Sequence, residues 1–503
     1  MGITVSTTGN GKFSPTGDQS DVIVSYSISE SASPVGLSDT SGEIPALSIV
    51  GESNKIETMG NTHPSSRLLI DNQLTLVDDL RGTFIGRVGS LSVDSNSVSA
   101  NVFSKFEKLT ATKRISPARG TLAEVFEAYF DEAGITSYDI SSALTEQIVV
   151  PAWTDNIWNG LKKLCIASNT EIYFQNGVVY VKRRATKQIN VTDITSESFE
   201  INLGEQAKTI KLTNIKTSWV EDAIAFTYGY GDSPESVEGD EVKEISVTSR
   251  VSLTSVNQPE YVTTSPDSYV EYISDRAIGT VPTELPNGFY SFRDKNGSIV
   301  PASVVASRGA GIKAEITDDP YEIKVTVTGP KGPLNTPWTL EFRDNYPALA
   351  LTGTGTLTDQ YSATFPTGSS LGDSENEYTD NPFLVNDIYF YNTAYYTCQQ
   401  VAGPVVKFSF STDKIEEASN QEFGYLPGAI FTYSGSKYRV RSVSYDYGNI
   451  NINADQYVTY ADFNSLWTGK TFEDFNDVML DPATYPDEYM KHSDFAILPL
   501  MEP

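Results

Sequence analysis

The residue types that most often carry catalysis or bind metals are scarce in this sequence of 503 residues. It holds two histidines, His63 and His492, and two cysteines, Cys165 and Cys398. Two cysteines cannot supply a zinc ribbon, a four-cysteine iron–sulfur site or a disulfide framework. His63 lies in a stretch rich in Gly, Asn, Ser and Pro, and His492 lies in an extended tail, so we expect neither to belong to a rigid catalytic site.

Sequence motifs of common active sites are also missing. There is no G-x-S-x-G elbow, no H-E-x-x-H pair and no P-loop, and Gly353-Thr354-Gly355 lacks the third glycine of a dinucleotide site. The 65 acidic residues supply too many carboxylate pairs for any pair to be informative. One acidic stretch lacks the spacing of an EF-hand, so we expect a solvated loop there. It contains Asp232, Glu235, Glu238, Asp240 and Glu241. The sequence therefore predicts a protein that is not an enzyme, with no cofactor and no metal site.

The charge balance argues against a protein that binds nucleic acid through its phosphates. With 36 basic and 65 acidic residues the formal charge is −29, and a surface that grips phosphates must instead be basic. The excess is spread over the chain except in residues 101–200, where 11 basic and 12 acidic residues nearly cancel. The simplest interpretation is solubility. No apolar run reaches the length of a membrane span and the N-terminus lacks the layout of a signal peptide, so we expect no membrane anchor.

Most of the chain has the pattern of β-strands. Residues 21–27, 67–77, 84–93 and 97–103 alternate apolar and polar side chains, and Gly, Asn, Asp and Ser separate them. This alternation is typical of antiparallel sheets with one face in water. The composition, with 39% hydrophobic residues, supports real cores.

Residues 111–185 have a different pattern, which predicts a compact α+β unit. Thr121 and Glu124 form a capping box before a helix that Gly134 should close. A second helix is predicted from near Thr154, with Cys165 on its apolar face. A hairpin follows, and its Asn176-Gly177 turn favours type I′, because both residues then need positive φ.

The remainder of the chain again predicts mostly strands. Residues 186–258 contain strand patterns, and residues 259–380 have turns at short intervals and strand-like runs such as 298–306, as in a small β-sandwich. Asn381-Pro382 is typical of a helix start, and the helix would extend to Gly403. Its apolar face would hold Leu384, Val385, Ile388, Tyr391 and Tyr395. A strand is the competing prediction, because the segment is rich in aromatic and β-branched residues. Strands return at 405–411, 430–433 and 438–443, and residues 461–503 have no clear periodicity.

Four stretches, in this order, resemble the minor tail proteins, or baseplate hubs, of long-tailed bacteriophages. The first is LTLVDD at 74–79 with GSLSV at 89–93, and the second is the capped helix that ends in EAGI at 132–135. The third is IWNGLKKLC at 157–165 followed by EIYF at 171–174 and a strand at 178–184 that ends in basic residues. The fourth is LPG at 426–428, YRV at 438–440 and YADFNSLWTGKT at 460–471, which resembles the end of such proteins in phages of actinobacteria.

This resemblance implies a mainly β fold with two tail-tube-like β-barrel domains, which inserted domains split. Residues 1–110 would form the first barrel and 111–185 the α+β insert. Residues 186–258, completed by 381–460, would form the second barrel around a β-rich insert at 259–380. The implied protein is a structural component of the virion at the tail tip. It would form a homotrimeric ring that joins the tail tube to the tip, beside distal tail and tape-measure or tip proteins.

The resemblance also implies that genome DNA passes through the ring without specific binding. We therefore expect part of the negative charge to face the channel, because a wall poor in Lys and Arg leaves the counterions of DNA undisturbed. The extended tail, 461–503, would pack against an adjacent subunit, a tip protein or its own barrel. Its candidate partner-binding residues are Phe463, Trp467, Phe472 and Phe475.

Two other functions are compatible with a β-rich, acidic and aromatic chain. One is a carbohydrate-binding module for a host receptor, which would use exposed aromatic rings as sugar platforms. Its candidate platforms are Tyr228, Tyr230, Tyr361 and Tyr378. The other is an extracellular glycan hydrolase, which would release reducing sugar.

Overall fold

The computed structural model describes the greater part of the chain in separate ranges. These are residues 3–8, 17–18, 20, 23–39, 41–52, 71–78, 81–93, 97–184, 188–191, 193–202, 206–228, 235–249, 251–263, 289–332, 337–342, 349–367, 375–401, 405–413, 415–417, 426–446 and 449–456. All structural statements below refer to these residues.

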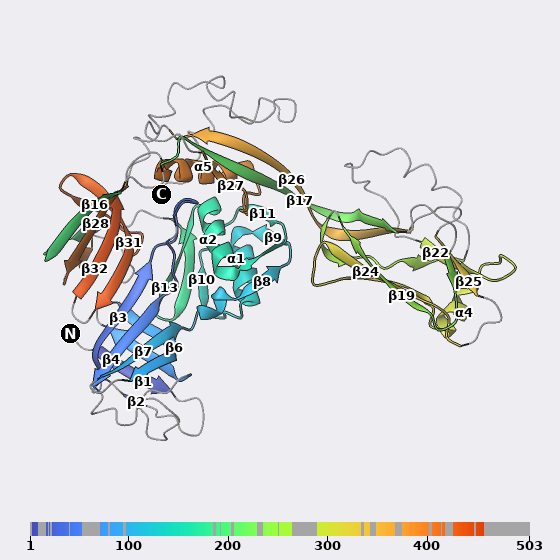
Figure 1. Cartoon of the computed structure of the whole chain (residues 1–503), viewed down its shortest axis with the longest axis horizontal. Helices are drawn as coiled ribbons and strands as arrows, with labels where there is room; N and C mark the ends of the chain where they lie inside the picture. Colours follow the sequence, from blue (N-terminus) through green and yellow to red (C-terminus); the bar gives the residue numbers. More distant parts are fainter. Residues whose placement is uncertain are drawn as a thin grey trace.

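A twelve-stranded antiparallel sheet dominates the fold, so the predicted mainly β class is confirmed (Figure 1). Its first half comes from the N-terminal part of the chain: β1 (Ile3–Thr8), β2 (Gly17–Asp18), β3 (Ile23–Ser31), β4 (Ala46–Glu52), β5 (Gln73–Asp78), β6 (Gly82–Val93) and β7 (Ser97–Ser104). Its second half comes from distant segments: β16 (Ser196–Asn202), β28 (Val405–Thr412), β30 (Ile430–Tyr433), β31 (Ser436–Asp446) and β32 (Asn449–Gln456). The order is β16-β28-β32-β31-β3-β4-β7-β6-β5-β1-β2, with β30 beside β31.

The two halves meet where β3 pairs with β31, from Ser27 opposite Asp446 to Ser31 opposite Ser442. Buried and exposed side chains alternate along the strands of this sheet. In β7, for example, Val98, Ala100 and Val102 are buried. The buried side chains of both halves belong to one hydrophobic core. The strands that we expected as two barrels therefore lie in one sheet and share that core.

The α+β unit follows β7. It contains a 3-10 turn (Glu107–Thr110), β8 (Thr112–Ile115), β9 (Ala118–Thr121), α1 (Leu122–Glu132), β10 (Tyr138–Ile140), β11 (Gln147–Val150), β12 (Trp153–Asn156), α2 (Ile157–Ser168), β13 (Thr170–Gln175) and β14 (Val178–Arg183). The capping box of Thr121 and Glu124 and the left-handed Gly134 are confirmed. So is the hairpin turn, because Asn176 and Gly177 both have positive φ, at 50° and 72°.

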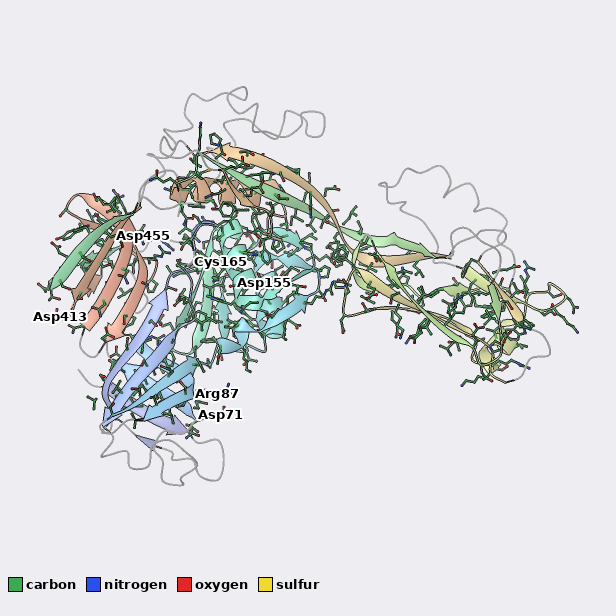
Figure 2. All side chains as sticks on the ribbon, viewed as in Figure 1. Asp71, Arg87, Asp155, Cys165, Asp413 and Asp455 are labelled. Atoms are coloured by element: carbon green, nitrogen blue, oxygen red, sulfur yellow. The ribbon has the colours of Figure 1, made fainter. Side chains whose placement is uncertain are left out.

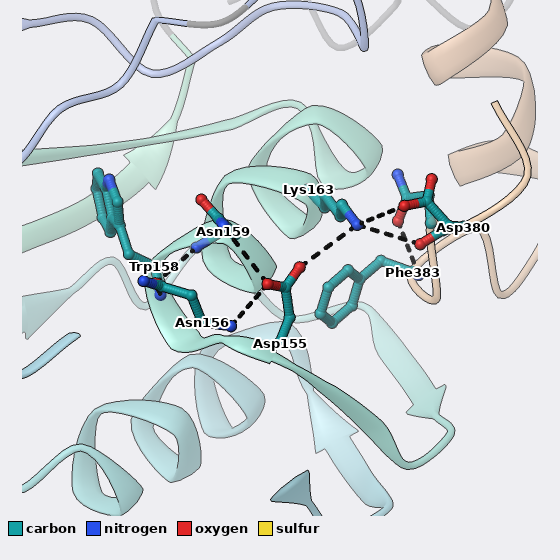
Figure 3. Close-up of polar contacts among 8 residues, drawn as sticks. Asp155, Asn156, Trp158, Asn159, Lys163, Asp380 and Phe383 are labelled. Atoms are coloured by element: carbon teal, nitrogen blue, oxygen red, sulfur yellow. Dashed lines mark hydrogen bonds and ion pairs between the residues drawn. The ribbon is translucent and has the colours of Figure 1, made fainter. Parts of the chain in front are cut away.

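The second helix begins three residues later than Thr154. Residues 153–156 instead pair with β8 as strand β12. Asn156 then caps α2, because its side-chain oxygen accepts a hydrogen bond of 2.9 Å from the amide of Trp158 (Figure 3). Further along the helix, Lys163 lies 3.5 Å from Asp155 and 3.3 Å from Asp380, and so joins the unit to the segment before α5.

Hydrogen bonds attach the α+β unit to β6 and to the connection between β3 and β4. The side-chain oxygen of Asn176 accepts a 2.9 Å hydrogen bond from the amide of Thr83 in β6. The indole of Trp158 donates to the carbonyl of Gly42 at 2.7 Å. The hydroxyl of Ser33 donates to the carbonyl of Ile172 at 3.0 Å. These hydrogen bonds hold the unit against the N-terminal part of the chain, which forms the first half of the sheet.

A long two-stranded ribbon leaves this body. It consists of β17 (Thr209–Tyr228) and β26 (Leu349–Pro366), with β27 (Glu375–Tyr378) parallel to the start of β17. The ribbon carries a distal module with its own hydrophobic core, on the right in Figure 1. The module contains β18 (Glu235–Val237), β19 (Val242–Thr248), β20 (Ser252–Val256), β21 (Glu260–Tyr261), β22 (Phe289–Arg293), α4 (Ala302–Ser307), β23 (Gly311–Ile316), β24 (Glu322–Thr328) and β25 (Trp338–Phe342).

In the structure, this insert begins earlier than residue 259, where the sequence predicts its start. Within 186–258, only β16 joins the twelve-stranded sheet, while β15 (Ile189–Val191) pairs with β29 (Ile415–Glu417). The strands β17 to β20 belong to the ribbon and the distal module. Alternation of apolar and polar residues identifies a strand, but it carries no information about which strand lies beside it.

Two predicted elements differ in type or position. Residues 298–306 were predicted as a strand, but residues 302–307 form helix α4 directly after Pro301. The helix predicted from Asn381 begins six residues later, as α5 (Asp387–Val401). The carbonyls of Leu384 and Val385 accept hydrogen bonds from β17 instead, so these residues pair with the ribbon. Asn386 accepts from the amide of Tyr389 at 2.8 Å at the real helix start.

None of the helices in the described ranges is long and apolar enough to span a membrane.

Candidate assembly surface

The twelve-stranded sheet ends in β16, which pairs along one side with β28. In the described part of the chain, no strand pairs with its other side. At the opposite end, β2 covers only Ser6 and Thr7 of β1. A sheet that does not close leaves backbone N–H and C=O groups available to another chain.

The β16 edge exposes large apolar side chains on the core side of the sheet. Phe199 is 50% exposed and Ile201 is 68% exposed. The ring of Phe199 stacks on the fully buried Phe408 with 4.4 Å between centroids and an interplanar angle of 7°. One face of Phe199 therefore covers the core, and its other face is free to contact a partner.

Polar side chains hold this edge in place. The hydroxyl of Tyr433 in β30 donates a hydrogen bond to the carboxylate of Glu197, and this bond raises the pKa of Tyr433. Ser196 donates to the hydroxyl of Ser411 at 3.1 Å. Two acidic side chains on the strand, Glu197 and Glu200, discourage nonspecific pairing, as charges on edge strands commonly do. The edge thus has the properties of a specific contact surface.

Sequence reasoning did not find this surface. The pattern Glu197, Phe199, Ile201 alternates with Ser198 and Glu200 and predicts an ordinary half-buried strand. Only the sheet order shows that the strand lies at an edge, where the core side remains open. The predicted partner-binding residues Phe463, Trp467, Phe472 and Phe475 lie outside the described residues, as do His63 and His492.

The proposed sugar platforms that the structure describes are not free rings. The hydroxyl of Tyr361 donates to Asp387 at 3.0 Å and accepts from the side chain of Asn214 at 2.7 Å. Burial, followed by the charge of Asp387, raises the pKa of Tyr361. Tyr361 and Tyr378 both pack against the core of the α+β unit and α5. The side chain of Tyr228 and all of Tyr230 lie outside the described residues.

Both cysteines are core side chains. Cys165 and Cys398 are buried free thiols, and burial raises the pKa of both, that of Cys165 to about 12. In the acidic loop, Glu241 accepts a 2.8 Å hydrogen bond from the amide of Glu238, and Asp240 accepts one of 3.1 Å from Gly332. Among the described residues no group of His, Cys, Asp and Glu side chains could hold a metal ion.

A buried ion pair lies inside the core of the sheet. The guanidinium of Arg81 donates to Glu30 at 2.8 Å and to the carbonyl of Thr83 at 2.8 Å. Asp78 accepts a hydrogen bond from the amide of Arg81 at 2.7 Å and another from the hydroxyl of Tyr26. Burial raises the pKa of Glu30, although Arg81 acts in the opposite direction. The cluster joins β3, β5 and the following turn, so its role is structural.

Comparisons with known proteins give weak similarities. No protein-family profile matches the chain, and no curated protein matches its sequence. Among solved structures, it is similar to a prophage tail protein from Listeria monocytogenes EGD-e (10% identity, TM-score 0.40, 90% of this chain and 94% of that one). It is also similar to a tail protein from Neisseria meningitidis MC58 (7%, 0.41, 90% and 95%) and a 43 kDa tail protein of prophage MuSo2 from Shewanella oneidensis (7%, 0.44, 90% and 98%). Scores of this size assign neither fold nor function to the chain.

Proposed function

We propose that this chain is a structural protein of a bacteriophage tail tip. It forms a homotrimeric ring, a baseplate hub, that joins the tail tube to the tip and surrounds the exit path of the DNA. The observation that carries the proposal is the open edge of the twelve-stranded sheet, where Phe199 and Ile201 remain exposed. A second copy of the chain that covers this edge buries both side chains.

The chain order supports the proposal. The resemblance to tail hubs implies a β framework that inserts interrupt and that the C-terminal strands complete. In the structure, β28, β31 and β32 come after the inserts and pair with β16 and β3. The exposed edge and the β1–β2 end lie at opposite ends of one sheet, so the proposed contacts between copies are head-to-tail. Head-to-tail contacts form a closed ring when the rotation from one copy to the next adds up to a full turn.

The proposed role is mechanical and includes no catalytic step. The buried thiols and the hydrogen-bonded Tyr361 are compatible with this role, because they pack inside the protein. We expect no release of reducing sugar from bacterial cell-wall polymers.

The proposal is tested by the mass of the protein in solution. For a chain of 55.0 kDa, light scattering should give about three times that mass, and electron micrographs should show rings. Phe199→Asp with Ile201→Asp should give a folded monomer, because a buried unpaired charge costs several kcal/mol per contact. Val242→Asp in the distal module, where Val242 is 60% exposed, is the matched control and should leave the ring intact. A wild-type monomer, or a ring that survives both β16 changes, contradicts the proposal.

The predicted tail contact is tested separately. Deletion of residues 461–503, which include Phe463 and Trp467, should weaken the ring if these residues contact an adjacent subunit. A trimer that stays intact would restrict their role to the parent subunit or to a tip protein.

A further inference from the structure

Three Asn-Gly steps lie in the described ranges, and the fold surrounds each of them differently. They are Asn159-Gly160 in α2, Asn176-Gly177 in the hairpin between β13 and β14, and Asn296-Gly297 in the turn after β22. In such a step the backbone nitrogen of the glycine can attack the side-chain carbonyl carbon of the asparagine, because glycine has no Cβ that shields the nitrogen. The attack requires that the asparagine side chain and the glycine amide can both move.

The reaction needs only water and hydroxide. The glycine nitrogen loses its proton and forms a bond to Cγ of the asparagine. The bond between Cγ and Nδ2 breaks, and Nδ2 takes up a proton and leaves as ammonia. Water then opens the cyclic succinimide at either of its two carbonyl carbons, which gives aspartate or isoaspartate. No oxidant or reductant takes part, and either product carries one more negative charge than asparagine.

Helix α2 protects Asn159. Its side-chain amide donates a hydrogen bond of 3.4 Å to the carboxylate of Asp155. The helical backbone directs the amide of Gly160 along the helix axis, away from the side chain of Asn159. Gly160 is also packed against Trp153, because a Cβ at this glycine would lie 2.2 Å from the indole ring. This step can react only if the helix unfolds.

The hairpin protects Asn176 in another way. Its side-chain oxygen accepts a hydrogen bond of 2.9 Å from the amide of Thr83 in β6. A Cβ at Gly177 would lie 2.7 Å from the side chain of Ile85 in the same strand. The carbonyl group that would be attacked is therefore held against β6, and the hairpin must leave that strand before the step can react.

The surroundings of Asn296 hold neither reacting group firmly. Residues 296–298 are exposed, and a Cβ at Gly297 would meet no atom within 4 Å. Within the described ranges, the hydrogen bond of Asn296 is made by its backbone amide, which donates to Asp294 at 2.8 Å, so its side-chain amide is free to rotate. The amide of Gly297 donates to the carbonyl of Asp294 at 2.9 Å, and the glycine has a φ of 78°. One bond of an exposed turn thus restrains the attacking nitrogen, and such bonds open readily.

We propose that Asn296 is a site of spontaneous deamidation in the folded protein, and that the fold protects Asn159 and Asn176. The inference is independent of the proposed function. The new carboxylate would lie in a turn where Asp294 already accepts hydrogen bonds from two backbone amides. In isoaspartate the backbone gains a methylene group, so this turn must rearrange. The distal module packs its own core, so the change stays at its surface.

The test follows the full-length protein by peptide mass spectrometry during incubation in mildly alkaline buffer. Fragmentation that distinguishes aspartate from isoaspartate identifies both products. Conversion of Asn296 should be at least about tenfold faster than that of Asn159 or Asn176, which corresponds to about 1.4 kcal/mol of local opening. In concentrated guanidinium the three steps should react at similar rates, because their local sequences all provide the same nucleophile. Asn296→Gln is the control and should remove the reaction, since a glutamine side chain would have to close a larger ring.

The outcomes decide the inference without reference to the ring. Equal rates at the three steps of the folded protein would overturn it, because the fold would then protect none of them. A native Asn296 that stays intact while the unfolded chain reacts would also overturn it, since the turn would be as well protected as α2. Fast conversion of Asn176 would show that its bond to Thr83 gives no protection and would overturn the second half of the proposal.

Discussion

Arg114 in β8 forms an ion pair with Asp319, and this contact joins the α+β unit to the turn between β23 and β24 of the distal module. A second contact lies nearby, where Arg119 is 3.0 Å from Glu221 of the ribbon and stacks on Trp219 at 4.5 Å. Beside Glu221 the ribbon changes register between Val220 and Ala223. The body and the module are thus connected by a ribbon with an irregular segment and by two arginines.

We predict that the two arginines hold the distal module against the body. Exposed ion pairs contribute only about 0.2–1 kcal/mol each, so Arg114→Ala with Arg119→Ala should release the module without unfolding it. Small-angle X-ray scattering should show a larger radius of gyration for this variant, and for the wild type in 1 M salt. Arg87→Ala, which removes an exposed pair with Asp71 in the sheet, is the control. The charge exchange Arg114→Asp with Asp319→Arg should restore the wild-type value, and an unchanged radius in the alanine variant would refute the prediction.

The same contact should depend on pH. The hydrogen bond from Arg114 lowers the pKa of Asp319 below its usual range. A lowered pKa means that the contact is complete above the unfolded-state pKa, near 3.9, and is lost as the pH falls through the folded-state pKa. Scattering at pH 5 should therefore equal that at pH 7, and the radius should rise only below about pH 4. Asp319→Asn should remove this dependence; release of the wild-type module at pH 5 would contradict the assignment.

Arg81 should be among the side chains most important for stability. Arg81→Met leaves the carboxylate of Glu30 buried without its cation, which costs about 3–5 kcal/mol. Urea unfolding followed by tryptophan fluorescence measures the loss. Arg87→Met is the matched control, because Arg87 pairs with Asp71 at 2.8 Å but both side chains are more than half exposed (Figure 2). We expect a loss below about 0.5 kcal/mol there, and equal losses for the two variants would be evidence against a buried pair.

Gly355 should not tolerate a side chain. A Cβ at this position would lie 2.0 Å from the carbonyl oxygen of Ser252, a backbone atom of the neighbouring strand β20. Gly355→Ala should therefore separate β20 from β26 and cost about 1–3 kcal/mol. Amide hydrogen exchange should increase in β20 and remain unchanged in the twelve-stranded sheet. Protection of β20 at the wild-type level would show that the strands have room to adjust.

Both thiols should be unreactive toward thiol reagents in the folded protein. Cys165 and Cys398 are fully buried and their pKa values are raised, so little thiolate forms near neutral pH. A thiol reagent should label neither residue in buffer and both in concentrated guanidinium. Rapid labelling of the native protein would place at least one thiol at the surface.

The sequence predicts helix caps and tight turns correctly where a few neighbouring residues determine them. Thr121 and Glu124 need only each other to cap a helix, and Asn176 and Gly177 need only their own φ angles to turn a hairpin. Both predictions are confirmed. The helix at Asn381 was misplaced because Leu384 and Val385 form backbone hydrogen bonds with β17, a strand about 170 residues earlier in the chain.

Long-range organisation could not be predicted in the same way. The alternation in β17 equals that of a barrel strand, yet β17 pairs with β26 to form the ribbon. The exposure of Phe199 and Ile201 depends on the position of β16 in the sheet order, which no local pattern encodes.

The ribbon has a consequence for how such a chain can change over time. Both connections to the distal module run through β17 and β26, and the module packs its own core (Figure 1). Residues between the two strands can therefore be exchanged, lengthened or removed while the strand pairs of the twelve-stranded sheet stay the same. The framework and the module can therefore change independently, because each packs its own core.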